Sequence, residues 1–279
     1  METDSDGAAP REPRARGVPE EGPAVPPADA PVDAVVFDLF DTLVDLDFGH
    51  LPLVDVGGRS VRSTYPLVHE ALAQVVAIPF ERFTAELLAV DRDIAEGAHR
   101  RCEEVSTRER FARLLGRLGI DRDRDAVLER LRAAHMSGLR AGASAAPRAA
   151  DVLRQLRARF RIGICSNFTD AATALAILDD AGLRDHVDAI AISETVGRRK
   201  PRSEPFRAVL RDLAATPERA VHVGDQLVED VAGPSAIGMR SAWAVRRIAD
   251  REERIRRAPD ARPTWIVTDL AELPATLRA

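Results

Sequence analysis

The chain has 279 residues, of which 45% are hydrophobic and 30% are charged, and its net charge at pH 7 is −5. These values are ordinary for a globular protein of one large domain or two modest ones, and they argue against a basic nucleic-acid-binding surface. The chain has two cysteines, which argues against a disulfide framework and fits a cytoplasmic location. No apolar run is long enough to span a bilayer, so no membrane partner is expected.

The N-terminal part begins with a segment, residues 1–31, that is rich in proline, alanine and glycine. We expect this segment to be a disordered tail, because it lacks the apolar stretch of a signal peptide. The apolar run from Ala34 to Phe37 predicts a buried strand, and Asp38 then places a carboxylate at the edge of a sheet. The stretch 45–63 predicts a long functional loop, with a small hairpin around Gly57-Gly58.

From Tyr65 to about Gly142 the apolar residues recur at helical spacing. Pro79 is expected to be the first residue of one helix, and Ser106 to Glu109 form a capping-box pattern before another. The predicted helices cover residues 65–76, 79–98, 106–119 and 125–139. We therefore predict a helical insertion after the first strand.

After Pro147 strands and helices alternate, which predicts a parallel sheet with right-handed crossovers. The predicted strands are residues 161–165, 189–192, 220–223, 241–245 and 265–267. The expected fold class is α/β, with a Rossmann-like core of three layers (α/β/α) and an inserted helical domain.

Polar side chains follow the predicted strands of this sheet. They are Asp38, Ser166-Asn167, Lys200, and Asp225 with Asp230. Because the carboxyl ends of parallel strands lie at one edge, we expect these groups to converge. Lys200 is the only lysine among 40 basic residues, which suggests that this position requires an ammonium. Asp38 and Asp225 offer the hard oxygen ligands that Mg²⁺ prefers, and Ser166 could hold an anion together with Lys200. A carboxylate nucleophile would then act through a covalent aspartyl intermediate.

Four motifs resemble, in order and context, those of the haloacid dehalogenase superfamily of aspartate-nucleophile hydrolases. They are Phe37-Asp38-Leu39-Phe40-Asp41-Thr42-Leu43, Cys165-Ser166-Asn167, Lys200-Pro201 and Gly224-Asp225-Gln226-Leu227-Val228-Glu229-Asp230. The resemblance covers about residues 32–278. It implies a catalytic core formed by residues 32–45 and 146–279 and a helical cap formed by residues 46–145.

The resemblance also implies a role for each matching residue. Asp38 would be the nucleophile, with Lys200 as a second catalytic residue. Ser166, Asn167 and Lys200 would bind the substrate anion. Mg²⁺ would be held by Asp38, Asp225 and the backbone carbonyl of Phe40, while Asp230 would act through a water or by fixing Lys200.

Phe40 departs from the family pattern, because phosphatases of this family usually have a second aspartate there as general acid and base. Asp41 lies one residue further on. On an extended strand that shift turns the side chain to the opposite face, so a turn-stabilising role is favoured over catalysis. General acid catalysis is worth roughly 10² to 10⁴ in rate. Its loss predicts a slow phosphatase, or one that acts on acyl or aryl phosphates.

The sequence therefore predicts a Mg²⁺-dependent hydrolase of a small phosphorylated metabolite that acts through an aspartyl-phosphate intermediate. One alternative is a 2-haloacid dehalogenase, because an aromatic residue at the position of Phe40 occurs in such enzymes of the family. Those enzymes lack the metal-binding aspartate, however, and this chain retains Asp225. The other alternative is a catalytically weak member of the fold that binds a phosphorylated ligand.

Overall fold

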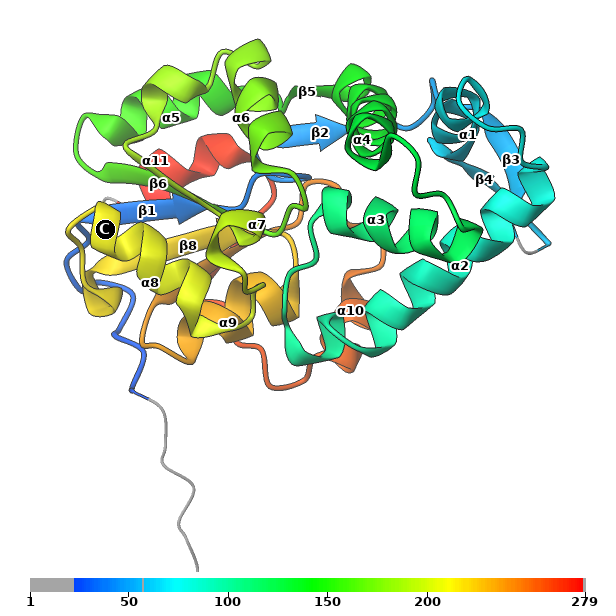
Figure 1. Cartoon of the computed structure of the whole chain (residues 1–279). Helices are drawn as coiled ribbons and strands as arrows, with labels where there is room; N and C mark the ends of the chain where they lie inside the picture. The colour runs from blue at the N-terminus through cyan, green and yellow to red at the C-terminus, as the bar shows by residue number, and fades with distance from the viewer. Residues whose placement is uncertain (1–22, 57, 278–279) are drawn as a thin grey trace, which may run out of the picture.

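The structure is a computed structural model that describes residues 23–56 and 58–277. Its centre is a six-stranded parallel sheet with the strand order β10-β9-β8-β1-β6-β7 (Figure 1). The strands are β1 (Ala34–Phe37), β6 (Arg161–Ser166), β7 (Ala189–Ile192), β8 (Ala220–Gly224), β9 (Arg240–Ala244) and β10 (Trp265–Val267). Strands of a parallel sheet are covered on both faces, which explains why β1 is apolar throughout. The predicted α/β class is confirmed.

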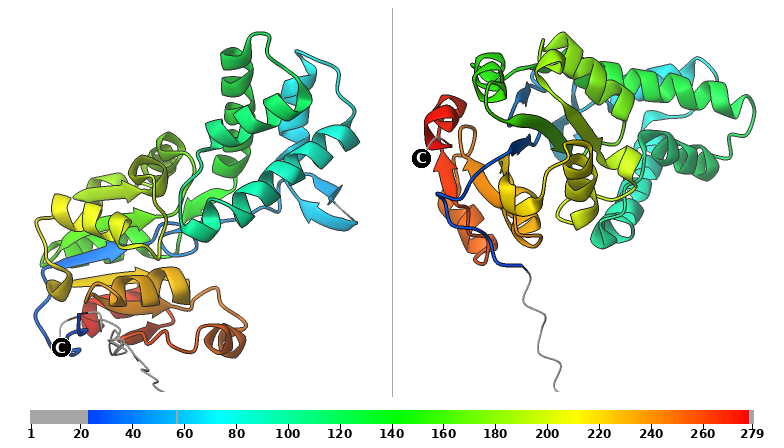
Figure 2. Two further views of the ribbon diagram at one scale, coloured as in Figure 1. Left: turned by 60° about the horizontal axis from the view of Figure 1, so that its bottom comes forward. Right: turned by 90° about the vertical axis from the view of Figure 1, so that its left-hand side faces the viewer.

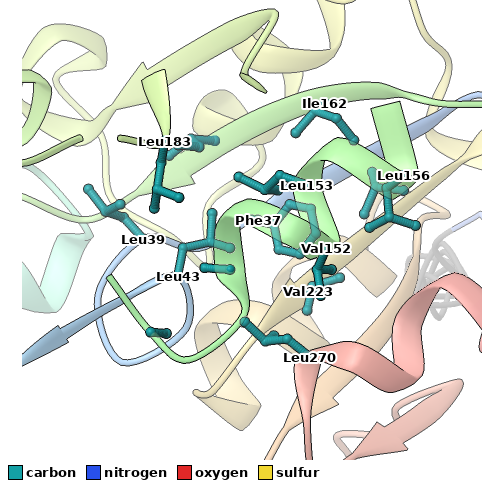
Figure 3. Packing of buried hydrophobic residues seen from close by; sticks show 14 of the residues in the cluster. Phe37, Leu39, Leu43, Val152, Leu153, Leu156, Ile162, Leu183, Val223 and Leu270 are labelled. Carbon is teal, nitrogen blue, oxygen red and sulfur yellow. The ribbon is translucent and has the colours of Figure 1, made fainter. Parts of the chain in front are cut away.

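Helices cover both faces of this sheet and so make three layers. One face packs against α5 (Ala149–Arg157), α6 (Ala171–Asp180) and the C-terminal helices η5 (Leu270–Glu272) and α11 (Leu273–Thr276). Figure 3 shows this cluster, in which Phe37 lies among Leu153, Ile162 and Val223. The opposite face packs against α8 (Ser203–Asp212). Successive residues of β1 point to alternate faces, so Val35 and Phe37 enter the first core, and Ala34 and Val36 the second.

The predicted helical insertion forms a unit around its own hydrophobic core, beyond the carboxyl ends of the strands (Figures 1 and 2). Its helices are α1 (Tyr65–Ala73), α2 (Phe80–Glu96), α3 (Thr107–Leu118) and α4 (Arg124–Ala141). The Ser106 hydroxyl accepts a hydrogen bond from Glu109 N and caps α3, but among the described residues the Glu109 carboxylate accepts from Arg113 and not from Ser106 N, so the predicted capping box is only half formed. Pro79 is not the first helical residue: its ψ of 140° is extended, and α2 begins at Phe80. Within the described ranges, no helix is long and apolar enough to cross a membrane.

Two short strand pairs lie where the chain passes between the sheet and the helical unit. Strand β2 (Val44–Leu46) pairs antiparallel with β5 (Ala143–Ala145), a contact that the sequence did not predict because β5 has no β-branched or aromatic residue. The predicted hairpin is present as β3 (Leu53–Val56) and β4 (Arg59–Arg62), although Gly57 itself lies outside the described residues. The cap boundaries at residues 46 and 145 stay a prediction.

Part of the predicted N-terminal tail packs on the core. Arg240 is fully buried, and its guanidinium donates to the carbonyl of Ala30 over 2.5 Å and to that of Pro31 over 2.8 Å. A buried charge needs such acceptors, so these main-chain carbonyls are held in place. The prediction of a disordered tail therefore does not extend to these last residues, and residues 1–22 lie outside the described part.

Candidate active site

The structure brings the predicted polar residues together at the carboxyl edge of the sheet. Asp38 follows β1, Ser166 ends β6, Asp225 follows β8, and Lys200 lies in the loop after α7 (Ser193–Val196). All four line one cavity of about 280 Å³. This convergence follows from the parallel topology, because every strand of the sheet ends on the same side.

Lys200 is the centre of the site. Its Nζ lies 2.6 Å from Asp38 Oδ1 and 2.6 Å from Asp230 Oδ1. Burial by itself would lower the pKa of Lys200, but the two carboxylates outweigh burial and hold that pKa above its ordinary value. Lys200 is therefore a fixed ammonium that touches the predicted nucleophile.

Asn167 positions Lys200 through its main chain. The Asn167 side chain accepts a hydrogen bond from Lys200 N over 2.7 Å and donates one to Lys200 O over 3.1 Å. Both ends of the amide are thus engaged by the loop, and its contact with substrate stays a prediction. The neighbouring Ser166 also lines the cavity, and its hydroxyl makes no hydrogen bond to another described residue. Ser166 is free to bind an oxygen of a ligand.

Asp230 is fully engaged by the protein. Besides Lys200, its Oδ1 lies 3.0 Å from Nε2 of the buried His222, which must be the donor because a carboxylate only accepts. Its Oδ2 accepts from Gln226 N over 2.9 Å. A Cβ on Gly224 would lie 2.4 Å from Asp230 Cγ, so glycine is required there. These contacts favour an indirect role for Asp230, as the predicted fixing of Lys200 requires.

A cation fits beside the carboxylates. Oxygens of Asp38, Asp225 and Asp230 lie within 4.8 Å of one another, and Asp230 already accepts three hydrogen bonds from the protein, so Asp38 and Asp225 are the better ligands. Burial raises the pKa of Asp38 to about 6 and that of Asp225 to about 8, and neighbouring carboxylates add to both shifts. A divalent cation would relieve this crowding of charge, and hard oxygen donors suit Mg²⁺. The predicted metal contact of the Phe40 carbonyl stays a prediction.

Phe40 and Asp41 take different positions at the cavity wall. The Phe40 ring packs against that of Phe168, with 4.7 Å between centroids, and Phe40 is the member of this pair that lines the cavity. Asp41 has a φ of 59°, in the left-handed region that aspartate tolerates in turns, and its N–H donates to Val44 O. Its side chain also lines the cavity and lies 3.4 Å from Arg247 Nε. Asp41 is therefore a turn residue that also borders the site.

Trp243 and Arg199 are among the residues at the site that the sequence pattern did not indicate. Trp243 lies within β9, and its indole N–H donates to the main-chain carbonyl of Asp225 over 2.8 Å. From sequence it resembles any core aromatic residue of a strand. Arg199 also lines the cavity. It was not singled out because it lies between two other basic residues, Arg198 and Lys200.

Comparisons with known proteins agree with this geometry. The model of the haloacid dehalogenase-like hydrolase family matches residues 32–238. The chain is 32% identical to the phosphoglycolate phosphatase of Rhodospirillum rubrum over 209 residues, which are 74% of this chain and 76% of that protein. It is 40% identical over 98 residues, 35% of the chain, to the human haloacid dehalogenase-like hydrolase domain-containing protein 3. The chain spans 38% to 56% of the length of this human protein and two other curated relatives.

A solved structure shows the same fold. The 2-haloacid dehalogenase of Pseudomonas syringae pv. Tomato superposes with a TM-score of 0.60 at 23% identity, and the match covers 88% of this chain and 98% of that one. At this identity the likeness concerns the fold alone. The match to the family model covers most of the chain, including all four motifs. The chain therefore belongs to the haloacid dehalogenase-like hydrolase family.

Proposed function

We propose that this protein is a Mg²⁺-dependent phosphatase of a small phosphorylated metabolite and that Asp38 is its nucleophile. The observation that carries the proposal is the pairing of Asp38 with Asp225 in one carboxylate cluster, with the ammonium of Lys200 on Asp38. Two buried carboxylates within 4.8 Å of each other need a cation to offset their charge. A metal ion at this place would suit phosphoryl transfer. The relative from Rhodospirillum rubrum is named for a small phosphorylated substrate, which supports the same class.

In this mechanism an oxygen of Asp38 attacks phosphorus. The new O–P bond forms as the bond to the leaving oxygen breaks, which yields an acyl phosphate on Asp38. Lys200 and the Ser166 hydroxyl bind the phosphoryl oxygens and so place phosphorus in line with the attacking oxygen of Asp38. Water then cleaves the acyl phosphate and restores the carboxylate. Asp38, Asp225 and the Phe40 carbonyl would hold Mg²⁺, whose charge offsets that of the phosphoryl group.

Phe40 limits the leaving groups that this site can expel. The leaving oxygen of an alkyl phosphate needs a proton. Phe40 stands where phosphatases of this family usually have an aspartate, and its ring, which packs on Phe168, cannot donate one. Aryl and acyl phosphates release stable anions and need no such donor. We therefore propose these activated phosphates as the better substrates.

The helical unit is proposed to act as the cap of this site. It has its own core and lies beyond the carboxyl ends of the strands, on the side of the sheet that holds Asp38 (Figure 2). Ligands of open α/β sheets bind on this side. We propose that residues 46–145 cover the substrate and contribute to its selection.

A second candidate function, 2-haloacid dehalogenation, is favoured by the aromatic pair. Phe40, which packs on Phe168, gives the cavity an apolar side chain, and displacement of halide by Asp38 requires no proton donor. Asp225 argues against it, because an attack of Asp38 on carbon requires no metal ion and would leave this buried carboxylate without a bound cation.

A substrate panel separates the candidates. Aryl, acyl and alkyl phosphates and 2-haloacids would be assayed on wild type and Asp38→Asn, with Mg²⁺ or with a chelator. The proposal expects Mg²⁺-dependent release of phosphate from aryl and acyl phosphates, and none from Asp38→Asn. Halide release from a 2-haloacid that persists with chelator would contradict the phosphatase proposal and support dehalogenation. Binding of phosphorylated compounds without turnover would favour the catalytically weak alternative.

A further inference from the structure

Arg199 is a second cation of the active-site cavity. Its side chain is 23% exposed, it lines the same cavity as Asp38 and Ser166, and it directly precedes Lys200. The two cations are used differently. The ammonium of Lys200 is shared by two carboxylates, whereas the guanidinium of Arg199 has one hydrogen-bonded partner among the described residues, Glu104.

Glu104 holds Arg199 from the side of the helical unit. It lies between η1 (His99–Arg101) and α3, and its side chain is only 1% exposed. Its Oε2 accepts from Arg199 Nη1 over 2.6 Å and from the hydroxyl of Ser193. The main chains also pair here, because Arg199 N donates to Cys102 O over 2.8 Å. One nitrogen of the guanidinium is therefore fixed, and the position of the whole group is set.

The other nitrogens of this guanidinium are free to bind a ligand. Arginine has five N–H donors in a planar fork, and Nε and Nη2 of Arg199 make no hydrogen bond to the described residues. The fork matches the oxygens of a carboxylate or a phosphate, and both are bound more strongly in a half-buried site than in water. The neighbouring Arg198 differs: it pairs with Glu103 over 3.2 Å, is 39% exposed and does not line the cavity.

We propose that Arg199 binds a second anionic group of the substrate, which makes the substrate class a phosphomonoester with a nearby carboxylate or second phosphate. This inference rests on the proposed phosphatase function. Carboxylates of Asp38, Asp41, Asp225, Glu229 and Asp230 line the cavity and repel any additional anion. A second anion is tolerated only where a cation offers it unused N–H donors. Arg199 offers them, because its one partner, Glu104, leaves Nε and Nη2 free, whereas the ammonium of Lys200 is shared by two carboxylates.

The test compares matched ligands as competitive inhibitors of p-nitrophenyl phosphate hydrolysis, so that it does not depend on their own turnover. Phosphoglycolate and ethyl phosphate differ by a carboxylate, and propane-1,3-diyl bisphosphate and propyl phosphate differ by a phosphate. In wild type, at least one doubly anionic ligand should bind about tenfold or more tightly than its singly anionic match, because a charged hydrogen bond contributes about 1.5 kcal/mol or more. The pair that shows the preference identifies the second anion.

Variants assign this preference to Arg199. Arg199→Met should bring the ratio of the two inhibition constants in a ligand pair close to one. Arg199→Lys should keep part of the difference between them, and Arg198→Met should keep the wild-type ratio. If Arg199→Met does not fold because Glu104 loses its partner, the double variant Arg199→Met/Glu104→Gln serves instead. Equal inhibition by both members of both pairs in wild type, or an unchanged ratio without Arg199, would overturn the inference. Hydrolysis of p-nitrophenyl phosphate itself tests the phosphatase function separately.

Discussion

Lys200 Nζ and Asp230 Oδ1 form a salt bridge of 2.6 Å in which the side chains are 2% and 1% exposed. The pKa of Asp230 lies below its ordinary value, because the opposing effect of burial is outweighed by Lys200 and His222. The carboxylate is thus charged and almost completely shielded from solvent, so water is a poor substitute for Lys200 as its partner. The pair therefore matters both for the placement of the catalytic ammonium and for the stability of the core.

Asp230→Asn is expected to lower the free energy of unfolding by about 1.5–3 kcal/mol, because it weakens a buried hydrogen bond between charged groups and leaves the ammonium of Lys200 with one buried counter-charge instead of two. Urea denaturation measures this loss. The matched control is Asp180→Asn, which breaks the exposed pair of Asp180 with Arg140 and should cost less than about 1 kcal/mol. Equal losses in the two variants would contradict a special role for the buried pair.

Phe40→Asp is expected to increase kcat for alkyl phosphates by tenfold or more, within the roughly 10² to 10⁴ that general acid catalysis supplies. The new carboxylate could protonate the leaving oxygen, while aryl phosphates should gain little because their leaving groups are already stable. The readout is the ratio of the two rates. Phe40→Leu controls for the loss of packing on Phe168 and should not change this ratio. A uniform change for both substrate types would show that proton donation is not what Phe40 removes.

The placement of the site could be predicted because it follows from periodicity and topology alone. The apolar run before Asp38 and the strand before Asp225 indicated buried strands, and parallel strands deliver their ends to one edge. The solitary lysine added a chemical signal at Lys200.

Other features depend on contacts between segments far apart in the chain. The bond between Asn167 and the main chain of Lys200 spans 33 residues, and that between Arg240 and Pro31 spans 209. An amide beside a serine looks like a turn, and an arginine in a strand looks like a surface residue. Only the packed structure shows which polar group each one satisfies, so the role of Asn167 and the order in residues 27–31 were not predictable.

Mg²⁺ binding is expected to weaken as the pH falls from 8 to 6. Burial and neighbouring carboxylates raise the pKa of Asp225 to about 8, so below that pH a proton must leave before the carboxylate can bind metal. The apparent Kd should rise by up to about tenfold per pH unit for one such proton. Titration followed by tryptophan fluorescence is suitable, because the Trp243 indole contacts the main chain of Asp225.

Two variants control the metal titration. Asp225→Asn should bind Mg²⁺ at least about tenfold more weakly than wild type, because it removes one charged oxygen ligand. Asp180→Asn changes an exposed carboxylate that does not line the cavity, so its Kd should stay near the wild-type value. A Kd that is independent of pH in wild type would show that Asp225 does not take up a proton when the metal leaves.

His135 is expected to make the helical unit sensitive to acid. Burial lowers its pKa to about 3, and the charge of Arg110 adds to this shift. Its Nδ1 lies 2.6 Å from the Thr64 hydroxyl, and its ring meets Phe111 edge-on. The unfolded chain therefore takes up a proton on His135 near pH 6.5, whereas the folded chain does so only near pH 3. The contribution of neutral His135 to the free energy of unfolding is fully present above pH 6.5 and is lost as the pH falls toward 3. Between pH 8 and pH 5 this single group removes up to about 2 kcal/mol.

The His135 effect is measured by urea denaturation at pH 8, 6.5 and 5 for wild type and His135→Gln. The variant loses the ring packing, so it is expected to be less stable at pH 8, but its stability should fall less between pH 8 and 5 because glutamine does not titrate. His186→Gln, in the short helix η2 (Arg184–His186) of the core, controls for the removal of a histidine elsewhere and should retain the wild-type slope. Parallel stability curves for wild type and His135→Gln would contradict the prediction, since they would mean that His135 gains its proton equally in the folded and unfolded chains.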